Sequence, residues 1–380
     1  MKLIHCADLH LDARMEASLP REKARERRQE VLRTFTRMVE TAEEQGVEAI
    51  LLCGDLFDAK TISARARNCV LDAVRNHPRI SFYYLQGNHD QNTFLADLEA
   101  LPGNLRTFGS EWRTYRQGDV CITGAEFSAD SSDGLLERLS LDAGQMNLVM
   151  LHGMATEYGA KDRMEEFSLR SLRGRNIDYL ALGHVHSFRE GRLDDRGIWC
   201  YSGCLEGRGF DECGEKGYVL LEIENGEIRT SFVPFASRRC WEIPVEITGL
   251  VTQEEIRTRV QEALLPVPSK DLVKVVLTGE VSPEAEKDAA WLEKWLEDSW
   301  YFLKVQDRTS LWVRPEDYQY DVSLKGEFVR LVLASPMTQE EKGTGSAAGN
   351  PRAGRGGLGC RFYGYILRIL ENSMGLIWSS

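Results

Sequence analysis

The chain has 380 residues, 42% hydrophobic and 28% charged, which fits a globular protein of one large and at least one smaller domain. Its formal net charge of −12 argues by itself against a nucleic-acid partner. At physiological salt, however, charges are screened over roughly 8 Å, so the charge near a binding site decides more than the total. No window approaches the ~18 apolar residues of a membrane span, and the start MKLIHCADLH does not read as an export signal, so we expect a cytoplasmic protein without a membrane partner.

Short apolar runs alternate with helix-like stretches over the first half of the chain. Apolar runs at 2–7, 47–54 and 80–87 predict strands, and amphipathic segments at 21–45 and 62–76 predict helices between them. This alternation predicts a layered α/β domain with a central sheet flanked by helices. Further strands are predicted at 119–127, 146–153, 177–186 and 197–203, and residues 217–235 predict a hairpin around Asn-Gly.

The first predicted helix is locally basic. Residues 14–37 hold eight basic and four acidic side chains, a balance of +4 in an acidic chain. One interpretation is a solvated helix face crossed by ion pairs four residues apart. The other is a surface for a polyanion.

After Pro234 the predicted elements become shorter and more mixed. Alternating strand-like runs at 240–249, 271–281 and 301–307, with a helix-like stretch at 282–300, predict a smaller α+β domain over 241–315. The segment 316–341 contains an amphipathic helical pattern. Residues 342–380 begin glycine-rich, which predicts disorder, and end in an apolar run with no core to join.

Nine cysteines are scattered without a CxxC pair, which favours buried or inert thiols in a reducing compartment. Cys200, Cys204 and Cys213 alone cluster enough to leave a zinc site open.

Residues that bind metals or move protons follow the predicted strands of the first domain. They are Asp8, His10, Asp55, Asp58, Asn88, His89, Asp90, His152, His184 and His186. Ligands of open α/β sheets bind at the carboxyl ends of the strands, so these side chains should converge. Five of the seven histidines belong to this set, and we expect the other two, His5 and His77, to be ordinary structural residues.

This mixture of ligands suits two metal ions. Two divalent ions about 3.5 to 4 Å apart can clamp the attacking and leaving oxygens of a displacement at phosphorus. One carboxylate should bridge the ions, and neutral imidazoles and an amide should fill the other positions. Asp8 and Asp55 would then supply −2 against +4, leaving a cationic site that attracts a phosphate diester.

The order DxH, GDxxD, GNHD, HG and GHxH over roughly residues 1–235 resembles the calcineurin-like metallophosphoesterases. The resemblance implies one ion held by Asp8, His10, Asp55 and His186, and a second held by Asp55, Asn88, His152 and His184. It further implies that His89 contacts the phosphate and protonates the leaving oxygen, with Asp58 bonded to His89.

Finer features, above all YSGCLEGRGFDECGEKGYVLLEI at 201–223, resemble DNA-repair exonucleases of the SbcD and Mre type, and most closely their YhaO-like branch. This glycine-rich loop contains Arg208 and Lys216, which could contact a DNA phosphate. An ordinary tight loop before a hairpin is the alternative.

The resemblance also implies partners. The domain at 241–315 would cap the site and guide DNA, 316–341 would bind an SbcC-like coiled-coil ATPase, and a homodimer is left open. The basic helix would line the DNA path. The tail at 342–380 departs from the family, which we interpret as a shift of reading frame near Lys342.

We therefore predict a two-metal DNA nuclease, with an exonuclease favoured, acting in double-strand break repair. Manganese is the metal that the resemblance implies, and the ligand set also permits iron or zinc. Two alternatives remain: a phosphodiesterase or phosphatase of the same fold for a small or protein substrate, and a scaffold of that fold without turnover.

Overall fold

The computed structural model describes residues 1–15, 19–58, 62–90, 100–126, 134–157, 166–282 and 284–312, together with residues 320, 322, 327 and 330. The chain divides into two compact units, Met1–Trp241 and Glu242–Ser380. Apart from those four single positions, the predicted ATPase-binding segment 316–341 and the tail 342–380 lie outside the described residues.

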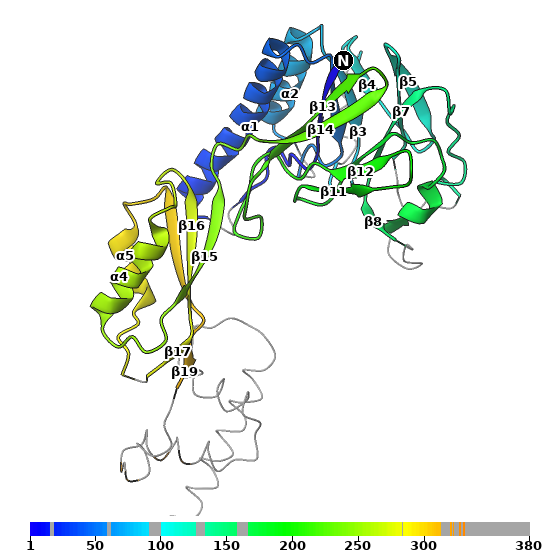
Figure 1. Ribbon diagram of the computed structural model, residues 1–380. Coiled ribbons are helices and arrows are strands. Elements are labelled where there is room, and N and C mark those ends of the chain that lie inside the picture. The colour runs from blue at the N-terminus through cyan, green and yellow to red at the C-terminus, as the bar shows by residue number, and fades with distance from the viewer. Residues whose placement is uncertain are drawn as a thin grey trace, which may run out of the picture. The chain divides into compact units, whose positions relative to one another are not determined.

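The first unit is built on two six-stranded sheets (Figure 1). The first sheet has the order β14 (Glu227–Pro234), β13 (Gly217–Glu224), β1 (Lys2–Cys6), β2 (Ala49–Cys53), β3 (Ser81–Leu85) and β4 (Leu105–Thr107). The second sheet has the order β11 (Arg189–Arg192), β12 (Ile198–Tyr201), β10 (Tyr179–Gly183), β7 (Met146–His152), β6 (Val120–Gly124) and β5 (Arg113–Gln117). The central strands of each sheet run parallel, so their carboxyl ends share an edge.

The two sheets are held together by one apolar core. Because side chains alternate across a strand, one face of the first sheet presents Leu3 and Leu51 to the second sheet. Ile122, Leu148 and Tyr179 of the second sheet belong to the same cluster of buried residues. The segment η1 (Leu169–Leu172) packs on the outer face of the second sheet. The short paired strands β8 (Met154–Thr156) and β9 (Glu166–Ser168) contribute Ala155 and Phe167 to the same apolar cluster.

Two helices cover the outer face of the first sheet (Figure 1). In α1 (Arg21–Glu44), Val31, Phe35 and Met38 are buried at the three- and four-residue spacing of one helical face. In α2 (Ala64–Asn76), the side chain of Ser63 caps the first turn by accepting a hydrogen bond from the Ala66 N–H. Both helices agree with the sequence prediction to within a few residues.

The strands predicted in the first unit are present, and so is the hairpin of β13 and β14. Its turn residues Asn225 and Gly226 have φ of 52° and 81°, the backbone that Asn-Gly favours. Strands β4, β5, β8, β9 and β11 were not predicted, since they are short or lie at sheet edges. The exposed β5 has no apolar alternation to reveal it.

The second unit contains a three-stranded sheet of β15 (Cys240–Glu246), β16 (Leu272–Thr278) and β18 (Phe302–Asp307). The remaining elements are α4 (Gln253–Leu264), α5 (Ala289–Leu296) and the paired strands β17 (Glu280–Val281) and β19 (Ser310–Leu311). Helix α4 was missed, although Thr252 and Glu255 form a capping box at its start. The helix predicted over 282–300 is confined to α5.

The observed architecture confirms the predicted fold class, a layered α/β sandwich with helices on its faces. The role of residues 241–315 as a cap that guides DNA stays a prediction. Among the described helices, none combines the length and apolar composition that a bilayer span requires.

Candidate metal centre

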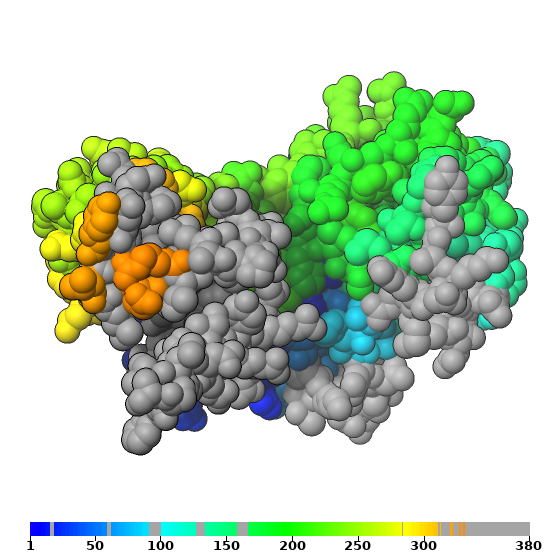
Figure 2. All heavy atoms as spheres, turned by 90° about the horizontal axis from the view of Figure 1, so that it is seen from below, coloured from blue at the N-terminus to red at the C-terminus, as the bar shows by residue number. Residues whose placement is uncertain are grey.

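The predicted ligands lie at the carboxyl ends of five strands, one to four residues past β1, β2, β3 and β10 and at the last residue of β7. Figure 2 views the molecule from this side, and blue and cyan surface from the early part of the chain lies there beside green surface from its middle. The topology therefore gathers residues that are far apart in the sequence, as in the hydrogen bond from the His184 N–H to Asp8, 176 residues away.

The first group consists of Asp8, His10 and His186, whose ligand atoms all lie within 4.8 Å of one another. The Nε2 atoms of the two histidines are 3.2 Å apart. Nδ1 of His186 is 2.7 Å from the Glu212 carboxylate, which favours the tautomer with its proton on Nδ1 and its lone pair on Nε2. Two nitrogens so close need a proton or a cation between them.

The second group consists of Asp8, Asp55 and His152, again within 4.8 Å. Nε2 of His152 lies 3.4 Å from Oδ2 of Asp55 and 2.9 Å from Oδ1 of Asn88. Asp55 is also 3.8 Å from Nε2 of His10, so its carboxylate stands between the two groups, where a bridging ligand is expected. The His184 ring lies edge-on to His152 with centroids 5.5 Å apart.

The backbone around these ligands is strained. Asp8, His10, Asp55 and His184 all have positive φ, between 43° and 104°, which non-glycine residues adopt only where other contacts hold them. Gly87 permits the tight approach, because a Cβ there would come within 2.2 Å of Oδ1 of Asp55. Strain concentrated in converging loops is typical of a functional site.

The electrostatics of the residues fit divalent cations. Burial raises the pKa of the Asp8 carboxyl. Burial also acts to raise the pKa of Asp55, but the hydrogen bond and charge of His152 outweigh it and bring that pKa below its usual range. The same pair, working against burial, raises the pKa of His152 to about 9. Buried carboxylates here demand positive charge, and a donor set of carboxylate, imidazole and amide groups is one that Mn, Fe or Zn accepts.

His89 and Asp58 lie beside this centre in the predicted contact, with Nδ1 of His89 2.9 Å from Oδ1 of Asp58. The His89 N–H donates to Oδ1 of Asp55 at 2.8 Å, while half of the His89 side chain is exposed. Asp58 is also 3.6 Å from Nδ1 of His10. His89 is therefore held at its backbone and at one ring nitrogen, which leaves Nε2 for a substrate.

Arg208 occupies a different position from the one that its expected contact with DNA suggests. Its guanidinium donates to Asp58 at 3.1 Å and to Glu212 at 2.7 Å, and Glu212 bonds His186. Burial acts to raise the pKa of Glu212, but the hydrogen bonds from His186 and Arg208 outweigh it and hold that pKa below its usual range. Arg208 thus links the metal group to the carboxylate behind His89.

Lys216 finds no support as a DNA contact. Only 4% of the residue is exposed, and its ammonium group donates to the His186 carbonyl at 2.6 Å. A buried cation in this position supports the loop that presents His186.

The two histidines outside the predicted ligand set, His5 and His77, make structural hydrogen bonds. His5 is buried, bonds the Tyr179 hydroxyl at 2.8 Å and has its pKa lowered to about 3 by burial, so it is a neutral core residue as expected. His77 bonds the Ala73 carbonyl. Within the described part of the chain, the side-chain groups placed to hold an ion contain no cysteine, so a zinc site made of Cys200, Cys204 and Cys213 gains no support.

The sequence placed Asp90 among the converging residues without giving it a role, and it did not identify the supporting carboxylate Glu212 at all. Asp90 accepts hydrogen bonds from the N–H groups of Leu56, Phe57 and Gly87, which joins the loops after β2 and β3. Its place in GNHD was the available signal. No local pattern identifies Glu212, because its partner His186 is 26 residues away.

A buried ion pair fixes the loop of Arg208 to α1. Arg27 is fully buried and donates to the Glu206 carboxylate at 2.8 Å and to the Gly207 carbonyl at 3.0 Å. Thr34 donates to the other oxygen of Glu206 at 2.7 Å. Part of the basic character of residues 14–37 is therefore structural.

Comparison with known proteins agrees with this geometry. Residues 1–188 match the model of the calcineurin-like phosphoesterase family. The chain is 28% identical to the uncharacterized metallophosphoesterase YhaO of Bacillus subtilis over 316 residues, which are 78% of this chain and 76% of the relative. It is 23% identical to the DNA double-strand break repair protein Mre11 of Methanosarcina acetivorans over 280 residues, 70% of this chain and 44% of the relative.

Among solved structures, the crystal structure of TT1561 of Thermus thermophilus aligns with 61% of this chain and 98% of its own, at a TM-score of 0.42 and 15% identity. The chain spans about three quarters of the length of YhaO but less than half of the Mre11 protein.

Proposed function

We propose that this chain is a metal-dependent nuclease that hydrolyses phosphodiester bonds in DNA, because residues 1–188 match the model of the calcineurin-like phosphoesterase family. The observation that carries the proposal is the meeting of two ligand groups that share Asp8, with Asp55 facing a histidine of each and His89 held beside them and half exposed. Similarity to a DNA double-strand break repair protein supports DNA as the substrate.

In this proposal Asp8, His10, Asp55 and His186 hold one ion, and Asp55, Asn88, His152 and His184 hold the other. Two divalent ions bound there would neutralise the charge of the phosphate and lower the pKa of a bound water. Manganese is the proposed metal, as the resemblance to SbcD- and Mre-type nucleases implies, with iron and zinc compatible with the same ligands.

The protein's own side chains position the substrate and protonate the leaving oxygen. Asp58 holds Nδ1 of His89, which orients the ring and directs Nε2 to the substrate. A protonated His89 can contact the phosphate and give its proton to the departing 3′- or 5′-oxygen. Hydrogen bonds through Arg208 and Glu212 connect Asp58 to His186, so one network supports both the acid and the ligand group.

The finer assignments rest on the same resemblance. We propose an exonuclease of the YhaO-like branch that works in the cytoplasm with an SbcC-like ATPase, which residues 316–341 would bind. A homodimer is compatible with this arrangement.

The proposal is tested with end-labelled linear duplex DNA and manganese. The parent should release labelled nucleotides progressively, whereas Asp55→Asn and His89→Ala should lose most of this activity. A parent that hydrolyses bis(p-nitrophenyl) phosphate but leaves the duplex intact would instead be a phosphodiesterase for small substrates. Hydrolysis of neither substrate with any of the three metals would favour a scaffold.

A further inference from the structure

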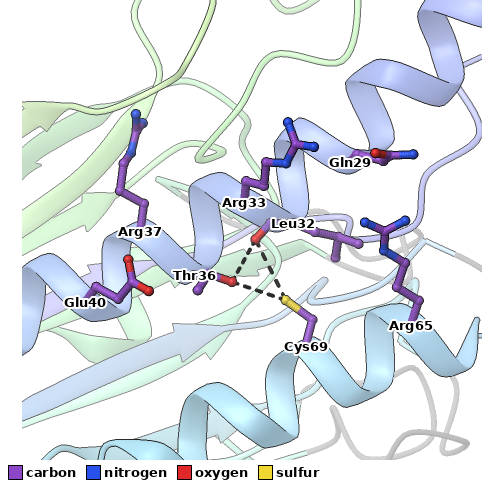
Figure 3. A pocket seen from close by; sticks show the side chains of 8 residues that line it. All are labelled: Gln29, Leu32, Arg33, Thr36, Arg37, Glu40, Arg65 and Cys69. Carbon is purple, nitrogen blue, oxygen red and sulfur yellow. Dashed lines mark hydrogen bonds between the residues drawn. The ribbon is translucent and has the colours of Figure 1, made fainter.

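A shallow groove of about 390 Å³ lies between the exposed faces of α1 and α2, outside the metal centre (Figure 3). Arg33 and Arg37 extend from α1, and Arg65 extends from α2. The floor is fixed where Thr36 bonds the Leu32 carbonyl at 3.1 Å and meets Cys69 at 3.4 Å. We call the three cations and this floor the arginine groove.

The charges of this groove are not neutralised by their own helices. Arg33 and Arg37 are four residues apart on one helical face, where like charges disfavour a helix by a few tenths of a kcal/mol. Glu30, three residues before Arg33, is committed to Arg27 at 2.5 Å and to Arg238 at 2.8 Å.

Among the residues that the structure describes, the guanidinium groups of Arg33 and Arg65 have no ion-pair or hydrogen-bond partner, and both residues are exposed. Arg37 is steadied by the Phe235 carbonyl at 2.5 Å and by the Phe235 ring, 4.4 Å from its guanidinium carbon. Glu40 is the single acidic residue lining the groove. On a helix face that serves only to contact solvent, such arginines would alternate with acidic residues and form ion pairs along the helix.

The groove begins at the same edge of the sheet as the metal centre. Arg65 is two residues past Ser63, the N-cap of α2, and the Ser63 N–H donates to the Asp12 carboxylate at 2.8 Å. Asp12 follows the predicted ligand His10 by two residues. A polymer engaged at the metal centre is therefore well placed to continue along α2.

Resting on the proposed function, we propose that the arginine groove binds the phosphodiester backbone of the DNA substrate away from the scissile bond. Guanidinium groups pair with phosphate oxygens in bidentate geometry, and contacts to the backbone position DNA without reading its sequence. An acidic protein segment is disfavoured because Leu32 and Cys69 give it little apolar lining, whereas protein interfaces depend on buried apolar anchors.

The test compares Arg33→Ala/Arg65→Ala with Arg75→Ala/Arg79→Ala, which removes two exposed arginines from the far end of α2 and the turn beyond it. Binding of a fluorescent duplex is measured by anisotropy in metal-free buffer, so that cleavage cannot interfere, over a series of salt concentrations. The groove variant should bind roughly tenfold or more weakly near 0.1 M salt, with the slope of log K against log salt smaller by about two. The control pair should match the parent.

Parent-like affinity and salt slope in the groove variant would overturn the inference, as would equal weakening in the control pair. Unchanged duplex binding with weaker binding of labelled poly-glutamate would assign the groove to an acidic protein and overturn it too. DNA cleavage by the parent is measured separately. A parent that cleaves nothing, combined with weakened duplex binding in the groove variant, would refute the nuclease function and leave the groove standing.

Discussion

The metal centre and the arginine groove both concentrate charge, but they hold it in opposite ways. The ligands Asp8, His10 and Asp55 are almost fully buried and are cross-linked by short contacts between loops. Arg33 and Arg65 of the groove are exposed on regular helices. The difference teaches that chemistry at a reacting atom needs fixed positions, whereas attraction of a long polyanion needs accessible charge and tolerates mobility.

Helix α1 contains both kinds of cation. Arg27 points inward to Glu206, and Arg33, less than two turns later, lies on the exposed face. Sequence composition treats the two alike, but burial separates them. Substitutions of Arg27 and Arg33 test whether burial separates the two kinds of cation.

The largest effect is expected at Asp55. Asp55→Asn removes the negative charge that faces a histidine of each ligand group, so metal binding should fall sharply. DNA hydrolysis should drop about a thousandfold, because bound metal ions contribute several kcal/mol to stabilising the transition state. Metal content by elemental analysis and initial rates on labelled duplex measure this. The control Asp72→Asn, exposed on α2, should match the parent, and a fully active Asp55→Asn would refute the assignment.

The buried arginine should matter for folding and the exposed one should not. Arg27→Met leaves Glu206 buried without its partner, which should lower the free energy of unfolding by about 3 to 5 kcal/mol. Arg33→Met should change it by no more than about 0.5 kcal/mol. Urea denaturation compares the two variants, and equal effects would erase the distinction between the two kinds of cation.

The carboxylate behind His186 should tune metal affinity. Glu212→Gln weakens the support of the His186 ring and of Arg208, so affinity for manganese should fall by roughly 10- to 100-fold. Isothermal titration calorimetry measures it, with Glu215→Gln, an exposed neighbour, as control. Unchanged affinity would show that His186 needs no such support.

The smallest effect concerns acid stability. Burial acts to raise the pKa of Glu30, but hydrogen bonds from Arg238 and Arg27 outweigh it and lower that pKa below the ordinary value. Ionised Glu30 therefore stabilises the fold above its unfolded pKa, and this contribution is lost as pH falls through the folded pKa. Glu30→Gln should cost about 1 kcal/mol at pH 7 and progressively less as the pH falls below the unfolded pKa. Thermal unfolding at several pH values measures this, and a pH-independent difference would contradict it.

Much of the first unit follows from the sequence because its signals are local. The apolar runs of β1, β2 and β3 alternate with amphipathic helices, and parallel strands bring their carboxyl ends to one edge. That rule alone predicted that Asp8, Asp55 and His152 would meet, as they do.

The remainder depends on contacts between distant parts of the chain. Arg27 belongs to a charged run typical of a solvated face, yet it is buried against Glu206, 179 residues away. Arg208 sits in a loop suited to phosphate, but Asp58, 150 residues away, engages its guanidinium. Such pairings have no periodicity, so a single sequence does not predict them.

Anomalous diffraction from crystals soaked in manganese would show whether Asp55 bridges a binuclear metal centre. We expect two anomalous peaks, one on each side of the Asp55 carboxylate, with Asp8, His10 and His186 around the first and Asn88, His152 and His184 around the second. A map without peaks in this cleft at saturating manganese would contradict that expectation.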